Sequence, residues 1–69
     1  MRKFAVEITK GNTETVIAVR DTLEEARTFG DEYFKTMTKE QGILTLFAGE
    51  FDANDQRVDR REEIFHIWR

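Results

Sequence analysis

The sequence predicts a small α+β protein in which two strands, one helix and two further strands follow in turn, a ββαββ order. Apolar and polar residues alternate near the N-terminus, a central segment carries an apolar stripe at helical spacing, and turn-forming stretches separate the segments. Since the first strand can run antiparallel to the second and third, we expect a four-stranded, mainly antiparallel sheet of order 2-1-3-4 with the helix on one face. The 69 residues contain no proline and no linker-like stretch, which predicts a single domain over residues 1–69.

The first two strands are expected to form a hairpin. Phe4, Val6 and Ile8 alternate with less apolar neighbours, and this period of two is typical of a strand with one buried side. Residues 10–12 read Lys-Gly-Asn, and glycine and asparagine tolerate the positive φ that tight turns require. Residues 13–20 are rich in β-branched side chains and are predicted to form the second strand.

A helix is expected to begin after Thr22, which with Glu25 has the spacing of a capping box. The residues that share one side of this helix are apolar or small: Leu23, Ala26, Phe29, Gly30, Tyr33, Phe34 and Met37. Because glycine is a poor helix former, its presence in this stripe predicts a close approach of the helix to the sheet. Four carboxylates are expected on the outer face: Glu24, Glu25, Asp31 and Glu32.

The last two strands are expected to form a second hairpin. Residues 43–51 are an apolar run of strand length, and residues 52–56 consist almost entirely of turn formers. The chain is then expected to return as a strand over residues 58–69.

The residue types of the chain disfavour catalysis. There is no serine and no cysteine, and the single histidine, His66, lies between Ile64 and Trp68 in a segment predicted to be a strand. Adjacent carboxylates at positions 24–25 and 62–63 diverge on a helix or point to opposite faces of a strand, so neither pair suits acid–base chemistry. We therefore expect a protein that is not an enzyme.

No cofactor and no metal site is expected either. Oxygen-bearing side chains between residues 52 and 63 occupy several ligand places of a calcium-binding loop, but Arg57 stands where that loop needs glycine. One histidine without cysteine cannot build a Cys/His metal site, and the chain has no glycine-rich phosphate-binding loop.

The composition also indicates the cellular compartment in which the protein is expected. No apolar stretch approaches the roughly 18 residues of a membrane span, and the first residues do not resemble a signal peptide. The chain has no cysteine, which fits a reducing compartment. We expect a cytoplasmic protein with no membrane partner.

Nucleic acid is disfavoured as a partner by the formal net charge of -3. The best candidate is the C-terminal hairpin, where arginines 57, 60, 61 and 69 are interleaved with Phe65 and Trp68. On a strand these arginines divide between two faces, and neighbouring acidic residues reduce the local positive charge. A nucleic-acid-binding module that uses this hairpin is kept as the weaker alternative.

Three of the four predicted strands are apolar on both sides, although one helix covers only one face of a sheet. This excess predicts an exposed apolar patch that meets another protein, either a different protein or a second copy in a homodimer. We expect the patch to consist of Ile17, Val19, Leu44, Leu46, Ile64, His66 and Trp68. Alternatively, strand twist, a loop or the C-terminus hides part of this face.

Residues 21–27, Asp-Thr-Leu-Glu-Glu-Ala-Arg, lie between a hairpin and a second one that turns at residues 51–55, an arrangement that resembles the short orphan proteins of bacteriophages and mobile elements. Among these, the anti-CRISPR inhibitors are the most similar functional class: small, acidic, cysteine-poor α+β domains that block a nuclease complex by occupying a protein or nucleic-acid-binding surface. The resemblance implies a non-enzymatic inhibitor whose partner is a host complex. It also implies that the four helix carboxylates would face a basic groove, whereas ordinary solvation of that face is the alternative.

Overall fold

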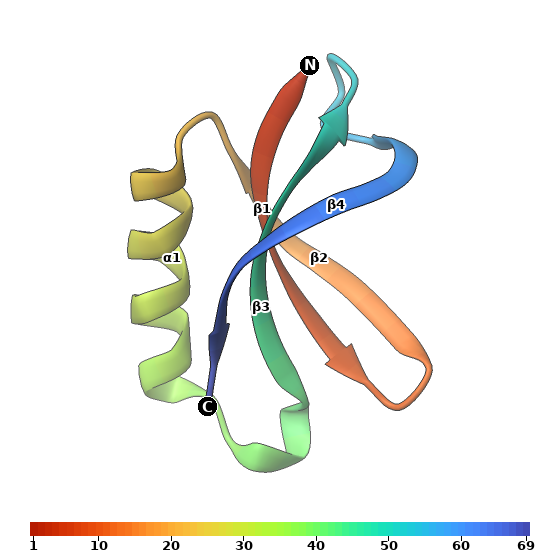
Figure 1. Ribbon diagram of the computed structural model, residues 1–69. Coiled ribbons are helices and arrows are strands. Elements are labelled where there is room, and N and C mark those ends of the chain that lie inside the picture. The colour runs from red at the N-terminus through yellow and green to blue at the C-terminus, as the bar shows by residue number, and fades with distance from the viewer.

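In the computed structural model, which describes residues 1–69, four antiparallel strands form one sheet of order β2-β1-β3-β4, and the longer helix lies across one face (Figure 1). The elements are β1 (Arg2–Lys10), β2 (Thr13–Arg20), α1 (Leu23–Thr36), the short 3-10 helix η1 (Lys39–Gln41), β3 (Ile43–Phe51) and β4 (Arg57–Trp68). The predicted α+β class, element order and strand order are confirmed. Neither helix has the length and apolar character that crossing a bilayer requires.

The β1–β2 hairpin turns at Gly11, which adopts the positive φ of 61° that the sequence predicts for this turn. The pairing contains a β-bulge: Val6 lies opposite Ala18, whereas the next residue of β1, Glu7, lies opposite Val16. Ile17 is therefore an extra residue in β2, and the strict alternation of sides expected for this strand breaks there. As a result, Val16 and Ala18 lie on opposite faces of the sheet.

The start of α1 follows the expected capping pattern. The Thr22 hydroxyl oxygen accepts a hydrogen bond from the Glu25 amide at 3.1 Å. The same hydroxyl donates to the Glu25 carboxylate at 2.9 Å, so the carboxylate closes the turn through the side chain and not through the Thr22 amide. The helix ends at Thr36, because Met37 already has extended backbone angles.

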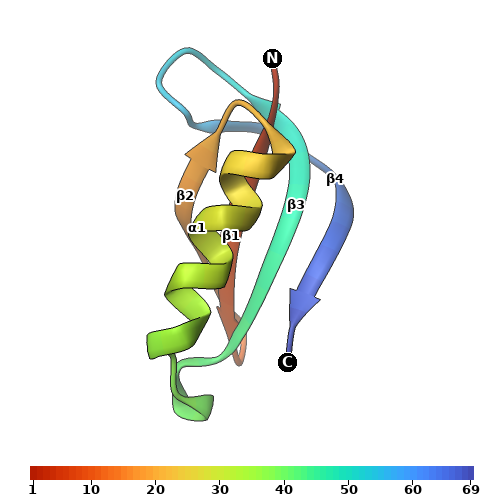
Figure 2. The same cartoon turned by 90° about the vertical axis from the view of Figure 1, so that its left-hand side faces the viewer.

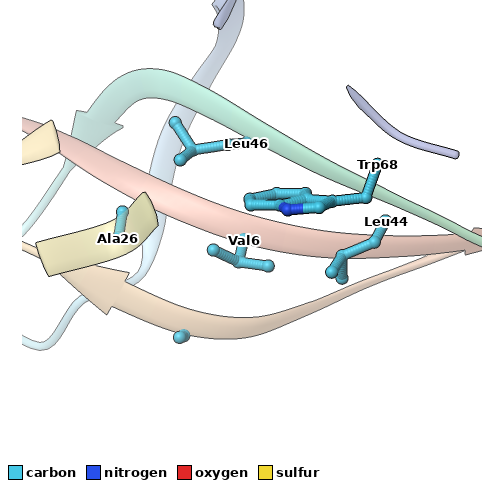
Figure 3. Packing of buried hydrophobic residues seen from close by; sticks show 6 residues of the cluster. Val6, Ala26, Leu44, Leu46 and Trp68 are labelled. Carbon is cyan, nitrogen blue, oxygen red and sulfur yellow. The ribbon is translucent and has the colours of Figure 1, made fainter. Parts of the chain in front are cut away.

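The main core lies between α1 and the sheet, on what we call the helix face. Its fully or nearly fully buried members are Val6, Ala18, Ala26, Leu44, Leu46 and Trp68. Figure 3 shows the Trp68 ring extending into this core beside Leu44, Leu46 and Val6. A side chain on Gly30 would overlap the Trp68 ring, which confirms the predicted close approach at this glycine.

A second, smaller core occupies the opposite side of the sheet, the far face. Ala5, Phe47 and Phe51 are buried there and Val19 packs against them. No second helix covers them. Instead, β4 runs diagonally across the sheet (Figure 1), and the guanidinium of its first residue, Arg57, lies 4.7 Å from the centre of the Phe47 ring. The curved sheet thus closes this core with its own last strand.

The prediction of one exposed patch is wrong, because its members divide between the two faces. Leu44, Leu46 and Trp68 are buried on the helix face. Phe47 and Phe51, on the other side of β3, lie on the far face under β4. Part of the apolar far face is therefore hidden by the twisted last strand, as in the alternative that the sequence left open.

Candidate functional site

Exposed apolar side chains remain near the C-terminal end of β4 despite this closure. Ile64, Phe65 and Ile67 of β4 are between one third and one half exposed. Phe34, near the end of α1, and Ile43, at the start of β3, are also exposed. These residues come from segments far apart in the sequence, which indicates a surface built by the fold.

A groove of about 800 Å³ lies in this region. We call it the α1–β4 groove; its lining residues are Phe34, Met37, Thr38, Lys39, Gly42, Ile43, Ile67, Trp68 and Arg69. It exists because α1 packs mainly on β1, β2 and β3, so that β4 lies to one side of the helix (Figure 2). Its size is in the range of ligand-binding pockets, and most of its contact surface is apolar.

Trp68 joins the groove to the core, because it lines the groove and is still only 7% exposed. Its indole Nε1 donates a hydrogen bond to the Asp31 carboxylate at 2.8 Å. The Arg27 guanidinium lies 5.8 Å from the ring centre, and the His66 ring meets Trp68 edge-on at 4.7 Å between centroids. These contacts hold the ring in one position, which makes Trp68 a rigid wall of the groove.

The Asp31 carboxylate supplies the negative charge that contacts Trp68. The hydrogen bond from Trp68 is the largest cause that lowers the pKa of this carboxyl, and the hydrogen bond and charge of Arg27 act in the same direction. Asp31 therefore stays ionised and keeps accepting from the indole at neutral pH. The helix and the last residues of β4 are tied together by this contact.

The charged residues that line the groove are both cationic. Lys39 and Arg69 belong to the lining, and no aspartate or glutamate side chain does. Neither cation forms an ion pair within the chain. A protein with a net charge of -3 thus presents a locally positive apolar groove.

The last residues of β4 line the groove, and the outer edge of this strand is unpaired, since β4 is the last strand of the sheet. Every residue of 57–63 except Val58 is charged, whereas residues 64–68 contain no Asp, Glu, Lys or Arg. Charged residues are a common protection of edge strands against pairing with other chains. The second half of β4 lacks that protection.

The remaining residues of the predicted patch lie apart from one another. Ile17 is the bulge residue and packs against the helix-face core, and Val19 packs against the far-face core. Ile64 lies opposite Phe47, which places it on the far face, whereas His66 lies opposite Leu46 on the helix face. Phe65, between them, is an extra residue in β4 and shares the helix face, where its ring contacts Phe4 edge-on. Of the seven residues, only Trp68 lines the groove.

The four helix carboxylates, the second predicted contact, are all exposed, but three of them have partners in the chain. Glu25 contacts the Thr22 cap, Asp31 contacts Trp68 and Arg27, and Glu32 pairs with Lys35 at 3.3 Å. Neither Glu24 nor Glu25 takes part in an ion pair, and Glu24 also has no side-chain hydrogen bond. These local contacts explain most of the acidic face without a basic partner.

Sequence reasoning missed most of the groove residues: Phe34, Met37, Lys39, Ile43, Ile67 and Arg69. The sequence predicts Phe34 and Met37 as core positions of the helix. Phe34 is exposed, whereas Met37, just after the helix, packs partly against the helix-face core and also lines the groove. The available signal was the length of the apolar stripe, which continues to the end of the helix.

No group of three or more His, Cys, Asp or Glu side chains is placed to hold a metal ion. His66 packs edge-on against Trp68, an arrangement typical of a structural side chain. Comparisons with protein-family models, with curated proteins and with solved structures find no match to this chain.

Proposed function

We propose that this protein is a non-enzymatic protein-binding domain whose contact surface is the α1–β4 groove together with the adjoining edge of β4. The observation that carries the proposal is the coincidence of three features in one place. These are an open apolar groove, exposed apolar side chains in its lining, and the unpaired outer edge of β4, whose residues 64–68 include no Asp, Glu, Lys or Arg. Apolar surfaces with aromatic anchors are typical of protein contacts.

The contacts of the arginines favour this function over nucleic-acid binding. Arg57 pairs with Glu62 at 3.0 Å and with Glu7 at 3.7 Å, and Arg61 pairs with Asp59 at 3.4 Å. Cations that are neutralised within the chain attract phosphates less. Two of the four arginines in the hairpin that the sequence suggested for nucleic acid are therefore paired within the chain, whereas Arg60 and Arg69 form no ion pair.

The narrower form of the proposal is an inhibitor of a host nuclease or defence complex, similar to the anti-CRISPR proteins. Its support is the resemblance in element order and composition, and the groove adds a surface through which such an inhibitor would act. A self-associating protein is the alternative, since a second copy would also cover apolar surface. Light scattering at high concentration separates the two, because self-association predicts a dimer in the absence of any other protein.

Site-specific photocrosslinking tests the location of the contact. A crosslinking amino acid in place of Ile67 should capture a partner from the natural host, whereas one in place of Val58, exposed on the charged half of the same strand, should not. Capture at both positions, or at Val58 alone, would contradict a contact at the groove. The captured species is then identified by mass spectrometry.

A further inference from the structure

We infer that the groove receives an extended segment of a partner protein that adds a strand to the outer edge of β4 and carries carboxylates beside large apolar side chains. This inference rests on the proposed function and specifies the chemistry of the partner. It combines three observations, on the strand edge, on the groove beside it and on the charge around it.

The strand edge offers backbone hydrogen bonds. After the bulge, β4 pairs regularly with β3, with His66 opposite Leu46 and Trp68 opposite Leu44. A regular strand that is paired on one side presents unpaired amide and carbonyl groups on the other. An extended peptide satisfies these groups by strand addition, a recurrent mode of peptide recognition.

The groove offers a place for side chains of the added strand. Trp68 belongs to β4 and also lines the groove, and its ring lies on the helix face. A strand on the outer edge of β4 lies across β4 from Ile43, so its side chains on the helix face would extend over Trp68 toward Phe34. Alternate side chains of an extended peptide point to one side, and large apolar ones would remove the exposed surface of the groove from water. A polar peptide would leave that surface uncovered.

The charge around the groove selects among apolar peptides. Lys39 and Arg69 have no ion-pair partners, whereas Arg27 and Lys35 of α1 are paired with Asp31 and Glu32. Carboxylates next to the apolar anchors would meet these two free cations, and cationic peptides would be repelled. A small amphipathic anion shares this charge pattern, but it cannot pair with the strand edge.

The experiment is a selection of short random peptides displayed on phage against the intact protein. Peptides enriched by the wild type should combine large apolar residues with Asp or Glu. Their binding is then measured by the emission of Trp68, the only tryptophan and a wall of the groove. Enrichment of neutral or basic peptides would overturn the inference.

A pair of double variants tests the role of the free cations. Lys39→Glu with Arg69→Glu should weaken the selected acidic peptides by about tenfold or more, whereas Lys10→Glu with Arg60→Glu changes the net charge equally and should leave affinity nearly unchanged. Lys10 and Arg60 suit this control because both are exposed and free of ion pairs. Equal weakening by both pairs would show general attraction and overturn the inference.

Backbone N-methylation of the selected peptide tests strand addition. Methylation of alternate amides in one of the two registers should abolish binding, and in the other register it should have little effect. If neither register matters, or if dodecanoate competes as well as the peptide, the occupant is not an added strand. A dimer that the peptide dissociates would identify a second copy as the natural occupant and would also overturn the inference.

These outcomes remain distinct from failure of the proposed function. Peptides that are not acidic but lose binding on Ile67→Lys would overturn only the charge inference. Peptides that bind without any effect of Ile67→Lys, together with crosslinking away from position 67, would remove the groove as the contact surface.

Discussion

The two halves of β4 differ in both composition and role. The first half, from Arg57 to Glu63, is charged and bends over the far-face core, where Arg57 covers Phe47. The second half, from Ile64 to Trp68, is uncharged and inserts its tryptophan beneath α1. One strand thus closes the far-face core with its charged half, completes the helix-face core through Trp68, and leaves an open apolar groove next to that tryptophan.

The largest effect on stability is expected from a substitution in the second half of β4. Trp68→Ala should lower the free energy of unfolding by about 3–5 kcal/mol, because it removes a large buried ring and leaves a cavity under Gly30. Urea unfolding followed by far-ultraviolet circular dichroism measures the change. Trp68→Phe keeps most of the ring volume and should therefore lower the free energy of unfolding clearly less than Trp68→Ala does. Equal losses for the two variants would show that packing at this position is loose.

A smaller loss of stability is expected from a substitution in the first half of β4. Arg57→Ala should cost about 1–3 kcal/mol, since it uncovers Phe47 and removes the cation that faces the buried Glu7. Arg57→Met keeps the aliphatic cover over Phe47 and should recover part of the loss. The same urea experiment compares them. No loss in either variant would mean that the charged half does not help to close the far-face core.

The buried Glu7 should make the far-face core sensitive to pH. Burial is the main cause that raises the pKa of this carboxyl, the charges of Glu14 and Glu62 add to it, and Arg57 opposes it. The fold therefore favours the protonated form, which means that ionisation of Glu7 costs stability at neutral pH.

Replacement of this carboxyl should accordingly stabilise the protein at neutral pH. Glu7→Gln is expected to be more stable than the wild type at about pH 7. The difference should shrink as the pH falls through the raised pKa and vanish below the ordinary value of 4.5, where both chains are neutral at this position. Urea unfolding at several pH values measures the difference. A Glu7→Gln variant that is less stable at neutral pH would show that the pair with Arg57 outweighs burial.

The smallest effect on stability is expected at the groove itself. Ile67→Lys should change the free energy of unfolding by no more than about 0.5 kcal/mol, because this side chain is 36% exposed, yet it should abolish partner binding. Val58→Lys is the matched control, with similar stability and unchanged binding. A large loss of stability for Ile67→Lys would identify this position as structural.

Much of the architecture was predictable from local patterns. The Thr22 cap, the turn at Gly11 and the close approach at Gly30 each depend on a residue type whose conformational preference is strong in any context. Strand order followed from chain direction and short connections. These properties are local, or they follow from simple rules of connectivity.

The candidate site was harder to predict because the two sides of β3 look alike in sequence. Leu44 and Leu46 form one apolar set and Phe47 and Phe51 form another, and a period of two does not tell which set faces the helix. The bulges at Ile17 and Phe65 then shift the alternation in β2 and β4. The wrong choice of face therefore placed buried residues of β3 in the predicted exposed patch.

The sequence by itself thus established the element order, the strand order and the cap of α1, since each depends on neighbours in the chain. The tertiary structure was needed to show that β4 bends over the far face and that α1 leaves Ile67 and Ile43 open beside the groove. The reason is that sheet curvature, bulge position and helix placement arise from contacts between distant segments, and no local pattern of residues encodes them.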